Sequence, residues 1–147
     1  MKMDIIKNNT DLGNTILRKK SDDILDIDKS IKNLIKKMKN TLNKSGGVGL
    51  AAPQVGINKN LILVKPENKI YVFINPVITN FSSEKTVDEE GCLSVPHVFL
   101  KIYRSKNISL KAKDEKGNDL DLNIDEYFAR IIQHEVDHLL GKLIIDY

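Results

Sequence analysis

The segment 126–140, close to the C-terminus, contains neither glycine nor proline and is followed directly by Gly141. Asp125 is a suitable N-cap, and a glycine commonly lies just beyond the end of a helix. We therefore predict a helix over residues 126–140. This helix constrains the fold more than any other element, because the rest of the chain has to bring further side chains to the residues that the helix carries.

Those residues are His134, Glu135 and His138, in a His-Glu-x-x-His pattern. Residues four apart in a helix are neighbours on one face, so both imidazoles can reach a single ion with a carboxylate beside them. The pattern is typical of zinc peptidases. Catalytic sites of this kind generally use three protein ligands, so this chain must supply one more.

Three residues are candidates for the third ligand: Cys92, His97 and Asp146. A thiolate is a strong ligand for a borderline metal ion, which favours Cys92. Gly91 beside it would allow another backbone to approach the ion closely. A lone cysteine can also be a simple core residue, but its setting next to three acidic residues and a glycine fits that role poorly.

The order of the predicted helices and strands along the chain indicates an α+β fold, with mainly antiparallel sheets packed around the C-terminal helix. An amphipathic helix is expected from Asp28 or Ser30 to Gly46, as the first helix of the chain. Strands are expected at 60–64, 69–79, 108–112 and 120–124, the last two forming a hairpin around the turn 114–118. The length of 147 residues favours a single domain spanning 1–147.

The glycine-rich stretch 47–54 literally matches a dinucleotide-binding fingerprint. That fingerprint must follow a strand and open a helix, whereas here a predicted helix precedes it, and Pro53 and Gly56 interrupt the space for a second one. We expect instead an extended edge against which another backbone can lie, with the Gln54 amide directed at a reacting group.

Composition excludes several classes of protein. The net charge is +3, with acidic and basic residues interleaved, which does not favour a specific nucleic-acid binder. The lysines between Lys29 and Lys44 most simply form the solvated side of the amphipathic helix. No apolar run is long enough for a signal peptide or a membrane span. We expect a soluble, cytoplasmic protein that does not associate with membranes.

Three stretches, GVGLAAPQ, EGCLS and QHEVDH, occur in this order, and together they resemble the three signature motifs of the peptide deformylases. The resemblance implies hydrolysis of the N-formyl group from the N-terminal formyl-methionine of nascent polypeptides, with release of formate. It also implies one divalent metal ion per chain, namely Fe²⁺, with Ni²⁺, Co²⁺ or Zn²⁺ able to substitute. The partners would be formyl-Met polypeptides, met transiently at the ribosome exit.

Matching the motifs residue by residue assigns roles. The resemblance implies that the metal ligands are Cys92, His134 and His138. It further implies that a metal-bound water is the nucleophile and that Glu135 is the general acid/base. Gln54 and the backbone N–H of Leu93 would hold the formyl oxygen.

For the substrate, the resemblance implies backbone pairing with Val48, Gly49 and Gly91. The apolar residues near the motifs that could line a pocket for the methionine side chain are Val48, Leu50, Leu93, Tyr127 and Ile131. The resemblance also suggests that Glu90 pairs with an arginine, for which Arg104 is the candidate.

Two other functions remain open at this point. One is a small metallopeptidase in which Asp146 or another carboxylate replaces the cysteine as a ligand. The other is a catalytically silent metal-binding module that interacts with the ribosome. The presence of both Glu135 and Gln54 argues against the second, because neither is needed merely to hold an ion.

Overall fold

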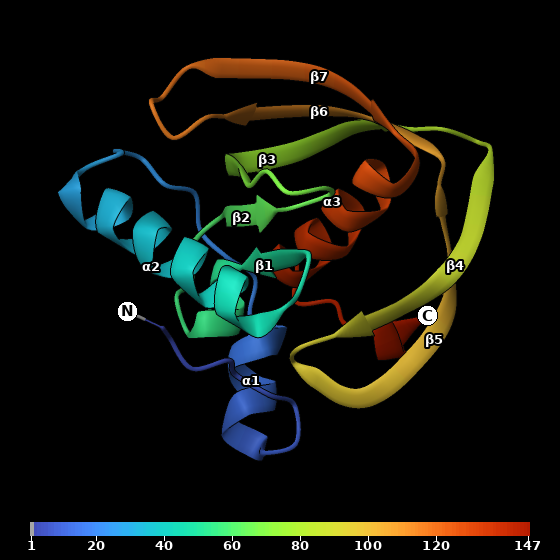
Figure 1. Ribbon diagram of the computed structural model, residues 1–147, viewed down its shortest axis with the longest axis horizontal. Helices are drawn as coiled ribbons and strands as arrows, with labels where there is room; N and C mark the ends of the chain where they lie inside the picture. Colours follow the sequence, from blue (N-terminus) through green and yellow to red (C-terminus); the bar gives the residue numbers. More distant parts are fainter. Residues whose placement is uncertain (1) are drawn as a thin grey trace.

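In the part of the chain that the structure describes, seven strands form two sheets in which every pairing between strands is antiparallel (Figure 1). The structure, a computed structural model, describes residues 2–147. The larger sheet has the order β1-β2-β3-β6-β7, and β4 and β5 form a separate two-stranded ribbon. The strands are β1 (Gly49–Ala51), β2 (Leu61–Val64), β3 (Tyr71–Phe81), β4 (Lys85–Cys92), β5 (Val95–Ser105), β6 (Asn107–Lys113) and β7 (Asp119–Asp125).

Three α-helices accompany the sheets. They are α1 (Asp11–Arg18), α2 (Lys29–Ser45) and α3 (Glu126–Leu139), and two short 3₁₀ helices are η1 (Ala52–Val55) and η2 (Ile144–Asp146). Figure 1 shows α2 and α3 on opposite sides of the larger sheet, with the curved β4–β5 ribbon beyond α3 on the right-hand side of the view. The predicted α+β fold around a C-terminal helix is confirmed.

At β2 the sheet is apolar on both faces because a helix covers each of them there. In β2, Leu61 and Leu63 belong to the core beneath α2, whereas Ile62 and Val64 belong to the core beneath α3. Successive side chains in a strand point to opposite faces, so a strand buried on both sides reads as an unbroken apolar run. This is why the sequence LILV lacks the alternation of a half-exposed strand.

The predicted helix 28–46 is confirmed as α2, and its two ends follow from the sequence. The Asp28 carboxylate accepts a hydrogen bond from the backbone N–H of Ile31, which is the expected N-cap interaction. At the other end Gly46 takes a left-handed conformation with φ of 73°, which glycine adopts without strain. The apolar face of α2 is buried and most of its lysines are exposed.

The predicted hairpin is also confirmed, as β6 and β7, and the glycine-rich stretch does form an extended edge strand, β1. The Asp114 carboxylate stabilises the hairpin turn by accepting hydrogen bonds from the backbone N–H groups of Lys116 and Asn118. Side chains of this type commonly replace backbone partners in turns.

Two features of the fold differ from expectation. The first helix is α1 rather than the helix at residue 28, so the prediction that the helical part begins near Asp28 was wrong. This helix has only 8 residues, and Thr10 caps it by accepting from the backbone N–H of Gly13. In addition, β4 and β5 occupy residues 85–105, where no strand was predicted. The acidic run Asp88–Glu90 of β4 lacks the apolar residues typical of strands.

We predict that Gly141, immediately after α3, is more sensitive to substitution than Gly46. Both have positive φ, so an alanine at either position costs about 1–2 kcal/mol of stability from backbone strain. A Cβ at Gly141 would in addition lie 2.7 Å from the carbonyl carbon of Arg18, whereas one at Gly46 would meet nothing within 4 Å. Gly141→Ala should therefore lose a further ~1–3 kcal/mol in urea unfolding. Equal losses for the two variants would contradict this packing.

Candidate metal centre and active site

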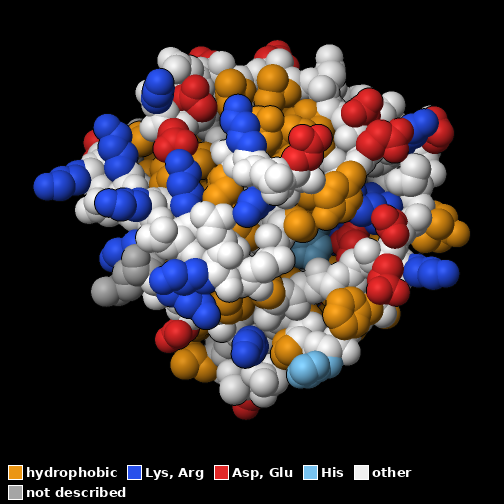
Figure 2. Space-filling view, viewed as in Figure 1, with side chains coloured by type: hydrophobic (Ala, Val, Ile, Leu, Met, Phe, Trp, Pro, Cys, Tyr) orange, Lys and Arg blue, Asp and Glu red, His pale blue; other side chains and the backbone are white. Residues whose placement is uncertain are grey.

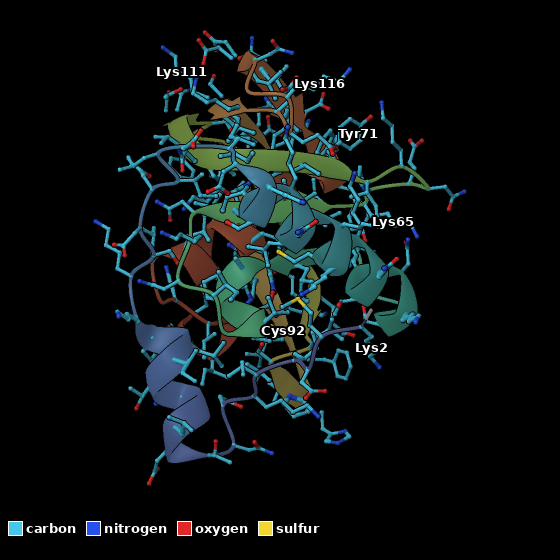
Figure 3. The ribbon with its side chains drawn as sticks, turned by 90° about the vertical axis from the view of Figure 1, so that its left-hand side faces the viewer. Lys2, Lys65, Tyr71, Cys92, Lys111 and Lys116 are labelled. Atoms are coloured by element: carbon cyan, nitrogen blue, oxygen red, sulfur yellow. The ribbon has the colours of Figure 1, made fainter. Side chains whose placement is uncertain are left out.

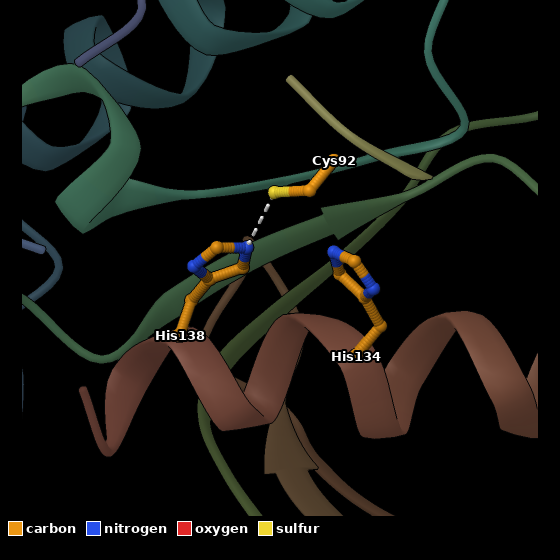
Figure 4. A group of neighbouring side chains, drawn as sticks. All are labelled: Cys92, His134 and His138. Carbon is orange, nitrogen blue, oxygen red and sulfur yellow. Dashed lines mark hydrogen bonds between the residues drawn. The ribbon is translucent and has the colours of Figure 1, made fainter. Parts of the chain in front are cut away.

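Cys92, His134 and His138 converge at one point between the ribbon and α3 (Figure 4). Cys92 is the last residue of β4, and the two histidines lie one helical turn apart on α3. One ligand atom from each residue lies within 4.8 Å of the other two, and Cys92 Sγ is 3.3 Å from His138 Nε2. The sequence prediction that these three residues come together is confirmed.

The group of donors fits a divalent metal ion. Metal–sulfur and metal–nitrogen bonds of about 2.3 and 2.0–2.1 Å, at tetrahedral angles, place the two ligand atoms about 3.5 Å apart, close to the observed Cys92–His138 separation. The competing candidates lie elsewhere: His97 is exposed on β5, and the Asp146 carboxylate accepts hydrogen bonds from Arg18 and from the backbone of Leu143. The structure therefore favours Cys92 as the third ligand.

The Glu90 carboxylate orients one of the ligands. Its Oε1 is 2.9 Å from His134 Nδ1, which leaves Nε2 of that ring free to face the metal site. An outer carboxylate of this kind fixes the ring orientation and increases the basicity of the ligating nitrogen. Burial by itself raises the pKa of Glu90, but hydrogen bonds from Arg104 and His134 outweigh it and lower the pKa to about 2.

Two buried guanidinium groups hold this carboxylate. Arg104, the predicted partner, donates from Nε and Nη2 to the two oxygens at 2.6 and 2.8 Å. Arg130 donates to Oε2 at 2.7 Å and also to the backbone carbonyls of Thr86 and Ile102. These bonds tie the ribbon to α3.

Sequence reasoning missed the outer part of this network. Arg130 precedes His134 by four residues and so lies on the same face of α3, a spacing that could have revealed it. Asp137 and Tyr147 extend the network further, because Arg104 Nη1 donates to both and the Tyr147 hydroxyl donates to Asp137 at 2.6 Å. No local pattern links these two residues to Arg104.

The electrostatics of the site favour a cation at His134. Burial alone would lower its pKa, but the charges and hydrogen bonds of Glu135, Cys92 and Glu90 outweigh burial and raise the pKa to about 10. Any positive species is stabilised there, and a metal ion competes with the proton for the same nitrogen. For His138, burial and the neighbouring positive charges push the pKa well below its usual value, which keeps this ring neutral and able to ligate.

Glu135 lies beside the three ligands and is almost completely buried. Its Oε2 is 3.9 Å from His134 Nε2, and its Oε1 has no hydrogen-bond partner among the described residues. Burial is the main cause that raises the pKa of Glu135 to about 7. A carboxyl group that titrates near neutral pH can both accept and donate a proton.

Gln54 lies in η1, with its side-chain amide held in one orientation. Its Oε1 accepts from the backbone N–H of Ala51 at 2.9 Å, and its Nε2 donates to Ser94 Oγ at 3.1 Å and is 3.7 Å from Cys92 Sγ. Because the oxygen is engaged by a backbone donor, the NH₂ group is the end that faces the metal site. Ser94, fully buried, is a further residue that sequence reasoning missed.

A cavity of about 1250 Å³ opens over this site. Figure 2 shows it as a hollow with histidine and acidic side chains at its base and hydrophobic side chains around it, and in Figure 3 Cys92 lies inward while Lys65 and Lys116 extend from the surface. The cavity is lined by these sequence-predicted residues: Val48, Gly49, Gln54, Gly91, Cys92, Leu93, Tyr127, Ile131, His134 and Glu135. Leu50, which was predicted to line the methionine pocket, does not do so, because it is fully buried in the core beneath α2.

Comparison with known proteins agrees with this geometry. The family model described as polypeptide deformylase matches residues 6–147 of the chain. The chain belongs to the peptide deformylase family. A peptide deformylase from Borreliella burgdorferi is 46% identical over 137 residues, which cover 91% of this chain and 82% of that protein. One from Synechocystis is 45% identical over 140 residues, covering 92% and 75% respectively.

Solved peptide deformylase structures have the same fold. The crystal structure of the enzyme from Thermotoga maritima superimposes with a TM-score of 0.92 at 40% identity, covering 98% of this chain and 96% of that one. The chain is thus a peptide deformylase, a metallohydrolase with a metal site made of Cys92, His134 and His138. This membership disfavours the metallopeptidase interpretation that relied on Asp146.

We predict that Glu90→Gln weakens metal binding about 10–100-fold, because the neutral amide no longer stabilises the ligating form of His134. The matched control is Glu89→Gln, on the exposed face of the same strand, which should leave the affinity unchanged. Competition with a chromophoric chelator measures both constants. If both variants bind metal as tightly as the parent protein, Glu90 does not act through His134.

Proposed function

We propose that this chain, as a single catalytic domain over residues 1–147, removes the N-formyl group from the formyl-methionine that begins nascent polypeptides and releases formate. The observation that carries the proposal is the placement of a buried carboxyl group and an oriented amide beside a Cys/His/His metal site. Glu135 and Gln54 both lie at the base of the open cavity. A protein that only stored an ion would need neither group.

We propose one ion per chain, Fe²⁺, with Ni²⁺, Co²⁺ or Zn²⁺ as substitutes; the family resemblance supports this choice. Cys92, His134 and His138 would hold this ion, which would supply Lewis-acid chemistry by lowering the pKa of a water molecule and polarising the substrate carbonyl. One thiolate and two neutral imidazoles leave the site with a net charge of about +1 when the ion is divalent, which favours this ionisation.

Glu135 moves the proton. In its ionised form the carboxylate takes the proton from the attacking water, and it then delivers this proton to the amine that leaves. The pKa of about 7 supports both steps, because the group then exchanges a proton readily at neutral pH. Cys92 serves as a ligand, so no acyl-enzyme forms during the reaction.

Gln54 and the backbone N–H of Leu93 hold the formyl oxygen as negative charge develops on it. The fixed orientation of the Gln54 amide supports this role, since its NH₂ group lies at the side of the metal site. Leu93 follows Cys92 directly in the turn between β4 and β5 and lines the cavity. Removing one donor of this type generally costs about 10²–10³-fold in rate.

The peptide chain of the substrate lies between β1 and the ribbon. Val48 and Gly49 on one side and Gly91 on the other pair with it through backbone groups, which gives little dependence on its sequence. The methionine side chain enters the apolar part of the cavity near Tyr127 and Ile131. A relative from Acinetobacter baumannii, 32% identical with a TM-score of 0.91 and coverage of 99% and 98%, has been solved with Met-Ala-Ser bound. Such a deformylated peptide is the product proposed here.

We further propose that the enzyme works in the cytoplasm and meets its substrates transiently at the ribosome exit, where formyl-Met polypeptides emerge. Among the described residues, the structure contains no helix that could cross a lipid bilayer.

We predict that anaerobically prepared, Fe²⁺- or Ni²⁺-loaded protein releases formate from a formyl-Met-Ala-Ser peptide at least about 100-fold faster than it releases acetate from the acetylated peptide. The physical reason is that the extra methyl group must enter the space around the polarised carbonyl. Formate is measured with a coupled dehydrogenase. Absence of formate release from protein with full metal content would overturn the proposed function.

We predict that Glu135→Gln retains the metal ion but loses at least about 10²-fold in kcat, because an amide cannot relay the proton. Glu126→Gln, an exposed position at the start of the same helix, should retain full activity. Metal content by mass spectrometry and formate release are measured on the same samples. Unchanged activity in Glu135→Gln would refute the proton-transfer role and favour the silent metal-binding module.

A further inference from the structure

Gly49 is the first residue of β1, a strand that packs against α3. Side chains alternate along this strand, and Leu50 belongs to the core beneath α2 while Ala51 belongs to the core beneath α3. Gly49 therefore faces the same way as Ala51, towards α3. The two smallest residue types thus stand on the side of β1 that approaches the helix carrying Glu135.

A side chain at Gly49 would collide with the proposed proton-transfer group. A Cβ built on this glycine would lie 2.9 Å from Glu135 Cγ, 2.8 Å from Cδ and closer still to Oε2. Real Cβ atoms essentially never approach other heavy atoms closer than 3.0 Å. The three atoms that a Cβ would meet first all belong to the Glu135 side chain.

The neighbouring glycine of the same motif is different. A Cβ at Gly47 would lie 3.2 Å from the end of the Leu93 side chain and 3.4 Å from Ser45 Oγ, so no atom comes closer than 3.0 Å. Neither glycine has a positive φ, so backbone strain does not distinguish them. The difference is what each one touches.

The surrounding structure limits how far Glu135 and β1 could move apart to make room for a side chain at position 49. Glu135 is only 4% exposed, so apart from the cavity that it lines little open space adjoins it. The strand cannot retreat either, because Leu50 and Ala51 are fully buried and paired with Leu63 and Ile62 of β2. A side chain at position 49 would therefore have to displace the carboxyl group itself.

We propose that Gly49 is a positioning residue for Glu135: the missing side chain leaves the space in which the carboxyl group is held beside the metal ligands. This role is additional to the backbone pairing of Gly49 with substrate, and it rests on the proposed proton transfer by Glu135. It explains why a glycine is needed at a position whose backbone conformation any residue could adopt.

The first part of the test separates positioning from substrate pairing. Nickel-loaded Gly49→Ala should lose about 10²-fold in kcat on a formyl-Met peptide, because a shift of about 1 Å in a reacting group has an effect of that size. Its KM should stay within about twofold of the parent value. A raised KM with an unchanged kcat would overturn the proposal and leave only the backbone role.

The second part does not depend on activity. Glu135→Ala removes Cγ, Cδ and Oε2, the three atoms that a Cβ at position 49 would meet. Gly49→Ala should lower the urea midpoint of the nickel-loaded parent protein, and most of this shift should vanish in the Glu135→Ala background. Gly47→Ala, the matched control, should shift both backgrounds equally, since uncoupled sites are additive.

The two parts distinguish failure of the inference from failure of the proposed function. Equal shifts for Gly49→Ala in both backgrounds would show that position 49 does not pack on Glu135, and would overturn the inference even if deformylation is fast. Coupling between the two positions in a protein that releases no formate would instead overturn the proposed function, and with it the positioning role.

Discussion

The carboxylate of Glu90 is the interaction on which the catalytic end of the molecule depends. It is buried, and it binds two guanidinium groups and one imidazole at once. Removing such charges from water costs several kcal/mol per ion, which only good geometry and complete hydrogen bonding offset. The network therefore fixes one arrangement of β4, β5 and α3, and it adds little to the net free energy of unfolding. His134 obtains its orientation from that arrangement.

Local sequence signals made helix α3 and its two histidine ligands predictable. The absence of glycine and proline from 126–140 and the spacing of His134 and His138 depend only on neighbouring residues. The choice of Cys92 rested on ligand chemistry, and the structure agrees because β4 ends beside α3. Arg130 carried a helical spacing that could have been used. The contacts of Asp137 and Tyr147 with Arg104 join distant parts of the chain, so no local sequence pattern predicts them.

Two of the elements that were not predicted, β4 and α1, have weak local signals for physical reasons. The ribbon strand β4 contains an acidic run, and its stability comes from pairing with β5 and from the two arginines rather than from apolar alternation. Helix α1 is short, contains a glycine and is kept in place by a cap and by the burial of Leu17. In both cases tertiary contacts override a poor intrinsic preference.

The ribbon and α3 each contribute only part of the metal site, and this division couples the ion to the shape of the protein. Cys92 comes from a strand outside the five-stranded sheet, whereas both histidines come from the core helix. Any state in which the ribbon separates from α3 loses a ligand, so the ion binds the closed form more tightly than the open one. By thermodynamic linkage, metal binding and ribbon docking then stabilise each other by the same free energy. A bound ion would thus stabilise the docking of the ribbon on α3 in addition to its role in catalysis.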